Sequence, residues 1–348
     1  MNLLHGVGDF FSLDIGTNSM RIVQLSGGVK TGWTLQRYAY VPIDPKVTAD
    51  TSEIGRRRFG EAVMGAVNQA GIKTKNVALG IPAGKTFTSI VEVEAASEKD
   101  LVKTFKYEID KYVPMPMSEA KASYIILGPS PNDPAKTELL VSSVAKEYAE
   151  ATMETIEKTG LNIVAMEPEP LAMARSLAIP GAIDAVMVVD FGEKSTDIVI
   201  VYQNQPRLVR SVAGGFEVLA KTLSTGLEVR EDQARQFILR FGLEENKIEG
   251  QVLKTLGSQL DVFAGELAKS VRFFQTKYLN GKVGQIVLSG YASMIPLFPE
   301  YIEAKTNIPT INGNPWQLVR TTLEQQRALS PVASEFAVAI GLSERSND

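Results

Sequence analysis

Residues 11–25 read FSLDIGTNSMRIVQL, and residues 187–201 read MVVDFGEKSTDIVIV. Each stretch has an apolar run, an aspartate, one apolar residue, a glycine, a few small or polar residues and a second apolar run. Apolar runs separated by Gly and polar residues are typical of two strands joined by a turn. The chain therefore contains the same predicted strand–turn–strand unit twice, which indicates a fold built from two similar halves.

The two turns carry groups that suit phosphate and magnesium. Gly16 and Gly192 permit close backbone approach, so N–H groups of each turn can bind phosphate oxygens. Asp14 and Asp190 supply carboxylate oxygens, which Mg²⁺ prefers and can hold through its waters. We expect the two aspartates to face each other across a cleft between two domains. The alternative is that both are turn aspartates that cap backbone amides.

Other residues near the turns are candidates for nucleotide binding. The hydroxyl and amide side chains after each glycine can donate to phosphate oxygens; they are Thr17, Asn18 and Ser19 in the first turn and Ser195 and Thr196 in the second. Lys194 either offsets phosphate charge or points to solvent. Gly214 and Gly215 open a predicted helix whose first N–H groups can face phosphates, or they form a plain helix-entry turn. Asp197 is expected to be structural.

Composition excludes several kinds of chemistry. The 348 residues are 44% hydrophobic and 22% charged, as in ordinary globular proteins, and the length suits two domains. There is no Cys and a single His, His5, so disulfides, thiolate catalysis and Cys-zinc sites are excluded and a Ser-His-Asp triad is not expected.

The charge pattern gives no sign of a nucleic-acid or membrane partner. The net charge is −4, without the basic face of a nucleic-acid binder. The one tight basic cluster, RRR at 56–58, is interpreted as a solvated helix face, with a binding patch as the alternative. No apolar run approaches the ~18–20 residues that span a bilayer, and Asp9 and Asp14 interrupt any signal-peptide pattern. We expect a cytoplasmic protein without a membrane anchor.

Strand and helix signals divide the chain. The pattern predicts strands at 88–95, 122–128 and 138–145 and helices at 97–115 and 146–159, which together form an α+β module inserted in a larger α/β protein. We expect a first domain at 10–85 and 164–183, an inserted module at 86–163, a second domain at 184–332 with a subdomain near 224–282, and a carboxy-terminal helix at 333–345 that packs on the first domain. Small-residue helices at 169–178 and 335–343 should cross closely through Ala172, Ala339 and Gly341.

These motifs, in this order, resemble the nucleotide-site motifs of the actin, chaperone and sugar-kinase superfamily, and within it the PilM family of type IV pilus proteins, which is related to FtsA. The likeness covers nearly the whole chain. It lies in LDIGTNSMRIVQL (13–25), KYEIDKYVPMP (106–116), MEPEPLAMARSLA (166–178), VDFGEKSTDIVIV (189–201), RSVAGGFEVLAKTLS (210–224), ELAKSVRFFQ (266–275), IVLSGYASMIPLFPEYI (286–302) and FAVAIGLSER (336–345). The resemblance implies an actin-like ATPase fold, with two RNase H-like domains around a nucleotide cleft and the inserted subdomain.

The resemblance also implies roles for individual residues. Arg21 stands where the family has a basic residue directed at phosphates, and Glu169 where the chaperones have a Glu that positions the metal or the attacking water; Glu167 competes for that role. Glu266 and Lys269 match a pair that brackets adenosine, with a surface ion pair as the alternative. Gly290 allows adenine to approach the backbone, and Tyr291 can stack on it.

The expected function is that of an ATP-binding scaffold of the type IV pilus inner-membrane platform, with ATP or ADP and Mg²⁺ as ligands. The resemblance implies that the amino-terminal cytoplasmic tail of PilN binds between the first domain and the inserted module, and that PilB- or PilT-type motor ATPases are further partners. Slow or absent ATP turnover is expected, because no residue is clearly placed to activate water. The alternatives are a sugar-kinase-type phosphotransferase and a filament-forming division protein like FtsA.

Overall fold

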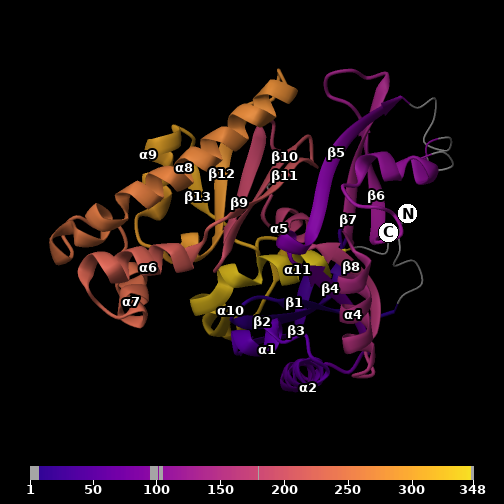
Figure 1. Ribbon diagram of the computed structural model, residues 1–348, viewed down its shortest axis with the longest axis horizontal. Helices are drawn as coiled ribbons and strands as arrows, with labels where there is room; N and C mark the ends of the chain where they lie inside the picture. Colours follow the sequence, from indigo (N-terminus) through magenta and orange to yellow (C-terminus); the bar gives the residue numbers. More distant parts are fainter. Residues whose placement is uncertain (1–7, 95–100, 102–104, 179, 346–348) are drawn as a thin grey trace. The chain divides into compact units, whose positions relative to one another are not determined.

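The computed structural model describes residues 8–94, 101, 105–178 and 180–345 (Figure 1). The chain forms two compact units: unit 1 runs to Ser176 and resumes at Asn314, and unit 2 is Leu177–Gly313. The domain boundaries expected from the sequence remain predictions. His5 and the predicted helix start near Ser97 lie outside the described residues.

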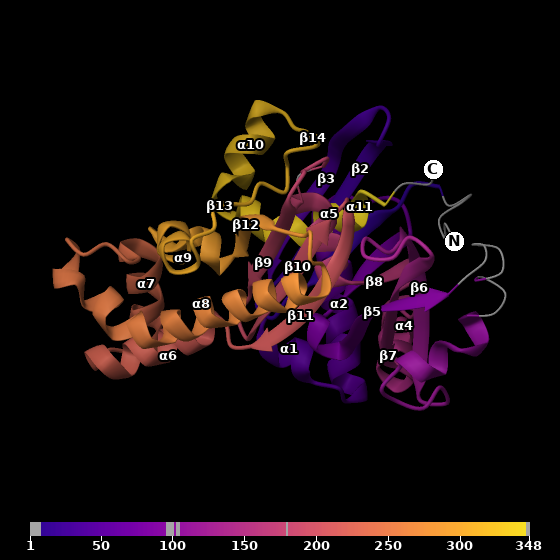
Figure 2. The same ribbon diagram turned by 90° about the horizontal axis from the view of Figure 1, so that it is seen from above.

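Unit 1 is built on a six-stranded sheet that begins with the first quoted motif (Figures 1 and 2). Its strands, in spatial order, are β14 (Val319–Arg320), β3 (Gly32–Pro42), β2 (Ser19–Gly28), β1 (Phe11–Ile15), β4 (Asn76–Ile81) and β8 (Asn162–Pro168). The strands β1, β2 and β3 are antiparallel neighbours, whereas β4 and β8 continue the sheet in parallel from β1. The predicted strand–turn–strand unit is confirmed here.

Unit 2 repeats this arrangement in a five-stranded sheet. Its order is β11 (Gln205–Ala213), β10 (Ser195–Tyr202), β9 (Ala185–Phe191), β12 (Val283–Gly290) and β13 (Thr310–Asn312). Again three antiparallel strands are followed by two parallel ones. The central strand β9 is almost wholly buried, which suits its unbroken apolar run. The doubled sequence motif therefore corresponds to a doubled sheet topology.

Helices cover these sheets. Unit 1 has α1 (Pro45–Ala49), α2 (Glu53–Gln69), η1 (Ala83–Lys85), α4 (Lys146–Glu157), α5 (Glu169–Leu177, which runs to the unit boundary), α10 (Leu323–Leu329), η6 (Ser330–Phe336) and α11 (Ala337–Ser343). Unit 2 has α6 (Phe216–Leu227), α7 (Glu231–Phe241), η4 (Ile248–Gly250), α8 (Gln251–Lys277), η5 (Tyr291–Met294) and α9 (Phe298–Thr306). Among the described residues, no helix is long and apolar enough to cross a membrane.

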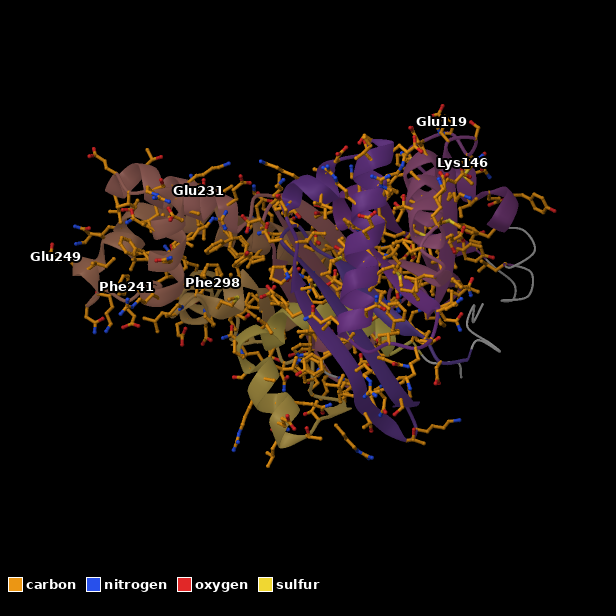
Figure 3. The ribbon with its side chains drawn as sticks, turned by 90° about the horizontal axis from the view of Figure 1, so that it is seen from below. Glu119, Lys146, Glu231, Phe241, Glu249 and Phe298 are labelled. Atoms are coloured by element: carbon orange, nitrogen blue, oxygen red, sulfur yellow. The ribbon has the colours of Figure 1, made fainter. Side chains whose placement is uncertain are left out.

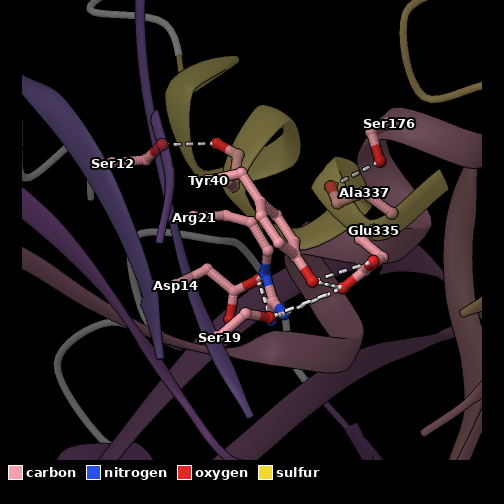
Figure 4. Close-up of polar contacts among 9 residues, drawn as sticks. Ser12, Asp14, Ser19, Arg21, Tyr40, Ser176, Glu335 and Ala337 are labelled. Carbon is pink, nitrogen blue, oxygen red and sulfur yellow. Dashed lines mark hydrogen bonds and ion pairs between the residues drawn. The ribbon is translucent and has the colours of Figure 1, made fainter. Parts of the chain in front are cut away.

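The close crossing of α5 and α11 is confirmed. A Cβ added to Gly341 would lie 1.8 Å from the carbonyl oxygen of Ala172, so only glycine fits at this crossing. Hydroxyl groups fasten α11 on both sides: Ser12 Oγ on β1 donates to Ala339 O at 2.6 Å, and Ser176 Oγ on α5 donates to Ala337 O at 2.7 Å (Figure 4). The carboxy-terminal helix predicted over 333–345 is wrong at its start, because residues up to Phe336 belong to the 3₁₀ segment η6.

The segment inserted after β4 carries a three-stranded sheet of its own in the order β5 (Thr86–Glu94), β7 (Lys136–Ala145) and β6 (Ala120–Pro129). The main-chain N–H of Lys146 donates to Glu119 O at 2.7 Å, which sets the start of α4 beside β6 (Figure 3).

The expected continuous helix over 97–115 is wrong for 105–112, which form two short 3₁₀ turns, η2 (Phe105–Tyr107) and η3 (Ile109–Tyr112). Stacking of Phe105 on Tyr112, with ring centroids 5.4 Å apart, favours this tight local packing over an extended helix.

Candidate functional site

The first turn is closed by its own backbone. Gly16 N–H donates to Ser19 O at 2.9 Å, and Asn18 O accepts from Ile43 N–H at 2.9 Å. Thr17 lies at the tip, and Asp14 is two residues before the turn on β1. The predicted phosphate-binding residues are thus held in a compact loop, but their contact with phosphate remains a prediction.

Asp14 is bound by Arg21, its direct cross-strand partner in the β1–β2 ladder (Figure 4). Asp14 Oδ2 accepts from Arg21 Nε at 2.8 Å and lies 2.6 Å from Nη2. The remaining guanidinium nitrogen, Nη1, donates to Ser19 Oγ at 2.8 Å and lies 3.8 Å from Glu335 Oε2. The side chain of Asp14 is 1% exposed, so both members of this ion pair are withdrawn from bulk water. Arg21, expected to be directed at phosphates, is directed at Asp14.

The electrostatics agree with a tightly held pair. Burial raises the pKa of Asp14 and is opposed by Arg21. Burial alone would lower the pKa of Arg21, but Asp14 outweighs it, with smaller contributions from Glu335 and Glu169, so that this pKa is raised. Burial also raises the pKa of Glu335, whose two oxygens are each 3.1 Å from the hydroxyl of Tyr40. Glu335 and Tyr40 are site neighbours that the sequence reasoning missed, because neither belongs to a recognisable motif.

Glu169, the candidate catalytic residue, lies in the same region of unit 1. A Cβ on Gly80, near the end of β4, would be 3.0 Å from Glu169 Cγ. Its charge raises the pKa of both Arg21 and Tyr148, although burial is the larger effect on Tyr148. The competing candidate, Glu167, is instead held by two arginines.

Those arginines give Glu167 a structural role. Glu167 accepts from Arg175 at 2.5 Å and 3.2 Å and from Arg345 at 2.6 Å, and the pair lowers its pKa against burial. This arrangement leaves Glu169 as the candidate for acting on water, which remains a prediction.

A hollow of about 310 Å³ opens beside the first turn. We call it the turn hollow. It is lined by Ile15, Gly16, Thr17, Val47, Thr48, Asp50, Thr51, Arg56, Phe59, Leu79, Gly80, Pro82, Lys85, Tyr148, Ala151, Thr152 and Thr155. These residues come from the first motif, from α1 and α2, and from α4 of the inserted segment.

A second hollow of about 430 Å³ runs between α2 and α4, and we call it the helix hollow. Arg56 and Thr155 line both hollows, so the two adjoin. Of the basic cluster at 56–58, Arg56 lines both hollows, Arg57 lines the helix hollow, and Arg58 lines neither. Arg57 and Arg58 are exposed, which agrees with the interpretation of 56–58 as a solvated face, whereas Arg56 is partly buried.

The second turn has the same closure in unit 2. Gly192 N–H donates to Ser195 O at 3.0 Å, and Thr196 Oγ1 donates to Gly214 O at 2.9 Å. Gly214 N–H donates to Lys194 O at 3.1 Å, so its amide is already engaged inside the protein.

The first N–H groups of α6 are engaged in the same way. Those of Phe216 and Glu217 donate to the carbonyl oxygens of Gly192 and Glu193, each at 3.0 Å. The roles of Gly214 and Gly215 toward phosphate stay predictions.

Asp190 and Asp197 are directly opposite each other in the β9–β10 ladder. Burial raises the pKa of Asp197 to about 6, against a hydrogen bond from Ser211. Among the described residues, Asp197 Oδ1 is buried without a hydrogen-bond partner. The expected structural role of Asp197 remains a prediction.

An ion pair holds a residue of the second turn. Glu193 is held by Arg235 of α7, whose Nη1 donates to Glu193 Oε2 at 3.1 Å. Lys194, between these supports, is exposed, in agreement with the solvent-facing alternative.

An apolar hollow of about 170 Å³ lies beside this turn. Its polar members are Thr196, Gln259 and Glu266, and its aromatic members are Phe191, Phe263 and Phe298, the last labelled in Figure 3. It is also lined by Gly214 and Gly215. An apolar hollow with a few convergent polar groups is typical of a small-molecule site.

Of the residues predicted to bind the base, Glu266 lines this hollow and the others do not. Lys269 and Glu266 form the expected ion pair, and Arg210, which the sequence reasoning missed, lies 3.5 Å from Glu266. Tyr291 stacks on Phe216 with ring centroids 4.2 Å apart rather than standing free for a base. Gly290 has φ of +63° and packs against Asp190, where a Cβ would lie 2.5 Å from Asp190 Oδ1. Neither Tyr291 nor Gly290 lines the hollow.

The predicted metal residues divide between the units, Asp14 in unit 1 and Asp190 in unit 2. Within the part of the chain that the structure describes, no group of three or more His, Asp or Glu side chains could hold a metal ion. The ion pair with Arg21 makes Asp14 a poor fit to Mg²⁺. Their roles toward a metal remain predictions.

The chain was compared with known proteins. The family of the type IV pilus assembly protein PilM matches residues 12–347. Among solved structures, the PilM–PilN type IV pilus biogenesis complex is similar, with 18% identity over 98% of this chain and 99% of that chain and a TM-score of 0.81.

Two further structures show the same fold. The ethanolamine utilization protein EutJ from Carboxydothermus hydrogenoformans has 13% identity, coverage of 97% and 90% and a TM-score of 0.57. MreB5 of Spiroplasma citri bound to ADP has 14% identity, coverage of 96% and 95% and a TM-score of 0.54. The fold is therefore actin-like.

Proposed function

The chain belongs to the PilM family of type IV pilus assembly proteins, and we propose that it is an ATP-binding scaffold that holds the amino-terminal tail of PilN. In this proposal it links the inner-membrane platform, on whose inner face it lies through its partners, to the PilB- or PilT-type assembly motor. The observation that carries the proposal is the pair of adjoining hollows beside α2 and α4, one of which reaches the first turn.

The hollows have the chemistry of a peptide site. Val47, Phe59 and Tyr148 supply apolar surface, and Thr48, Thr51 and Thr152 supply hydroxyls that can bind peptide N–H and C=O groups. Arg56, at the junction, already donates from Nη1 to Thr51 O at 3.0 Å, which holds its guanidinium in place. The helices α2 and α4, which line both hollows, belong to unit 1. The first covers the six-stranded sheet, and the second comes from the inserted segment.

The nucleotide part of the proposal is supported separately in each unit. In unit 2, the apolar hollow with Thr196 and Glu266 suits a base or ribose. In unit 1, the first turn is compact, and Arg21 lies next to it. MreB5, which shares the fold, is bound to ADP. When bound, Mg²⁺ would supply charge neutralisation for the phosphates, with Asp190 as the carboxylate that fits it.

The basic cluster offers a matched test of the peptide site. Arg56→Glu should weaken binding of a synthetic PilN-tail peptide by about tenfold or more, because a charged hydrogen-bond donor contributes roughly 1.5–3 kcal/mol. Arg58→Glu makes the same charge change on the same helix but away from both hollows, so it should leave the affinity within about twofold.

Fluorescence anisotropy of a labelled peptide measures both affinities. Ala151→Trp, which fills the turn hollow, should also abolish binding, whereas Ala135→Trp on an exposed loop of the inserted segment should not. Equal effects of Arg56→Glu and Arg58→Glu would contradict the proposal that the peptide binds in the turn hollow and the helix hollow.

A further inference from the structure

Three parallel strands of unit 1 end at the same edge of its six-stranded sheet (Figure 1). The strand β4 lies between β1 and β8 and pairs in parallel with both. After this edge, β1 continues into the first turn, β4 into η1 with Lys85 as its last residue, and β8 into Glu169. In α/β sheets, ligands bind outside the carboxyl ends of parallel strands. The edge therefore places a lysine next to the first turn within one unit.

Lys85 differs from Arg21 in the state of its charge. Arg21 Nη2 lies 2.6 Å from Asp14 Oδ2, and Nη1 donates to Ser19 Oγ, so the arginine is already neutralised. Lys85 is exposed, and within the part of the chain that the structure describes its ammonium group pairs with no carboxylate. Its Nζ lies over the ring of Tyr148, 5.6 Å from the ring centroid. Such a contact is weak at an exposed site, so an anion can draw the flexible lysine away from the ring.

The turn hollow brings Lys85 together with further groups that suit an oxyanion. Thr17, at the tip of the first turn, supplies a hydroxyl, and Arg56 supplies a second cation. Among the described residues that line the hollow, the only acid is Asp50, whose Oδ1 already accepts from Ser52 N–H at 3.0 Å. Positive charge therefore exceeds negative charge around this hollow.

We propose that Lys85 recognises the terminal phosphate of ATP at the first turn, and that it leaves the ring of Tyr148 to do so. The terminal phosphate is the free end of the nucleotide and carries its highest negative charge, so it is the group that an unpaired lysine attracts most strongly. ADP lacks this phosphate and leaves Lys85 on Tyr148. Because Tyr148 also lines the proposed peptide site, Lys85 connects the state of the nucleotide to that site. This inference rests on the nucleotide part of the proposed function.

The first test is the Kd for ATP and for ADP, measured by calorimetry on folded variants. Lys85→Met should weaken ATP binding about tenfold and ADP binding no more than about twofold, and Lys85→Arg should restore the Kd for ATP to within about threefold of the wild type. The matched control is Lys146→Met, since Lys146 is exposed, lies two residues before Tyr148 and lines neither the turn hollow nor the helix hollow. It should change neither Kd by more than about twofold.

The second test needs no substitution. Acetylation of the wild type by a lysine-specific reagent, followed by mass spectrometry, should be slowed about threefold or more at Lys85 by saturating ATP but not by ADP, while Lys146 reacts at one rate throughout. The inference is overturned if Lys85→Met weakens ATP and ADP equally or weakens neither, or if ATP leaves the acetylation of Lys85 unchanged. A wild type that binds no ATP would instead refute the nucleotide part of the proposed function.

Discussion

Replacing Gly341 by Ala should destabilise unit 1 strongly, although alanine is the better helix former in other settings. Gly341 lies in α11 where it crosses α5. An added Cβ would be 1.8 Å from Ala172 O, 2.5 Å from Ala172 C and 3.1 Å from Ala172 Cα. All three are backbone atoms, so no side-chain rotation relieves the clash and the two helices have to separate.

The magnitude follows from this geometry. Overpacking of a filled core costs typically about 1–3 kcal/mol, and a clash with backbone belongs at the upper end. For a unit of this size, 1 kcal/mol shifts the melting temperature by roughly 2–4 °C, so we expect a fall of about 6–12 °C. Separation of the helices also strains the hydrogen bonds of Ser12 and Ser176 to α11.

The chain offers both a probe and a control for this prediction. The two tryptophans, Trp33 and Trp316, lie in unit 1, so intrinsic fluorescence reports the unfolding of that unit. Gly65, in the middle of α2, is exposed, and a Cβ there would meet nothing within 4 Å. Gly65→Ala should therefore raise the melting temperature by about 1–4 °C, through the usual gain of roughly 0.4–1 kcal/mol.

The two glycine-to-alanine variants are expected to shift the melting temperature in opposite directions, which makes their comparison decisive. If Gly341→Ala melts within about 2 °C of the wild type, the close crossing of α5 and α11 does not exist in solution. A similar gain in both variants would mean that helix propensity alone governs the two positions.

Three further outcomes are expected. Burial raises the pKa of Glu344 to about 8, so the folded state holds this proton more tightly than the unfolded state; its stabilisation is complete below about pH 4.5 and is lost as the pH rises through about 8. The unfolding free energy should thus fall with pH across this range, by at most about 1.4 kcal/mol per pH unit, and Glu344→Gln should flatten the curve in urea titrations. Arg235→Met should remove the support of Glu193 and lower the urea midpoint of unit 2, followed by circular dichroism, whereas Arg240→Met on the same helix should not. ADP release should be slow and unchanged by added sugars; strong stimulation by a sugar would favour the sugar-kinase alternative.

Much of the fold was predictable because it is coded locally. The alternation of apolar residues around each Asp-x-Gly turn specifies a hairpin, and the small residues Ala172, Ala339 and Gly341 mark a close helix crossing. The failure at 105–112 has a tertiary cause, since the helical spacing there is overridden by aromatic packing of Phe105 with Tyr112 and Tyr124.

The site was predictable as a set of motifs but not as a set of contacts. The pairing of Asp14 with Arg21 follows by counting from a turn closed between Gly16 and Ser19, yet the sequence does not show where such a turn closes. Glu335 reaches Arg21 and Tyr40 across separations of about 300 residues, for which one sequence holds no signal. The sequence likewise holds no signal for the helix hollow, because α2 and α4 are far apart in the chain.

The first turn connects the two proposed ligands physically. Gly16 and Thr17 form part of the wall of the turn hollow, and Tyr148 and Thr152 of the inserted segment form another part. A peptide in the hollow therefore packs against the turn that is proposed to hold phosphate. Any movement of the turn that favours one ligand changes the space left for the other, and by linkage the effect on affinity is equal in both directions. The inserted segment thus places the proposed peptide next to the first turn, where Arg21 already balances the charge of Asp14.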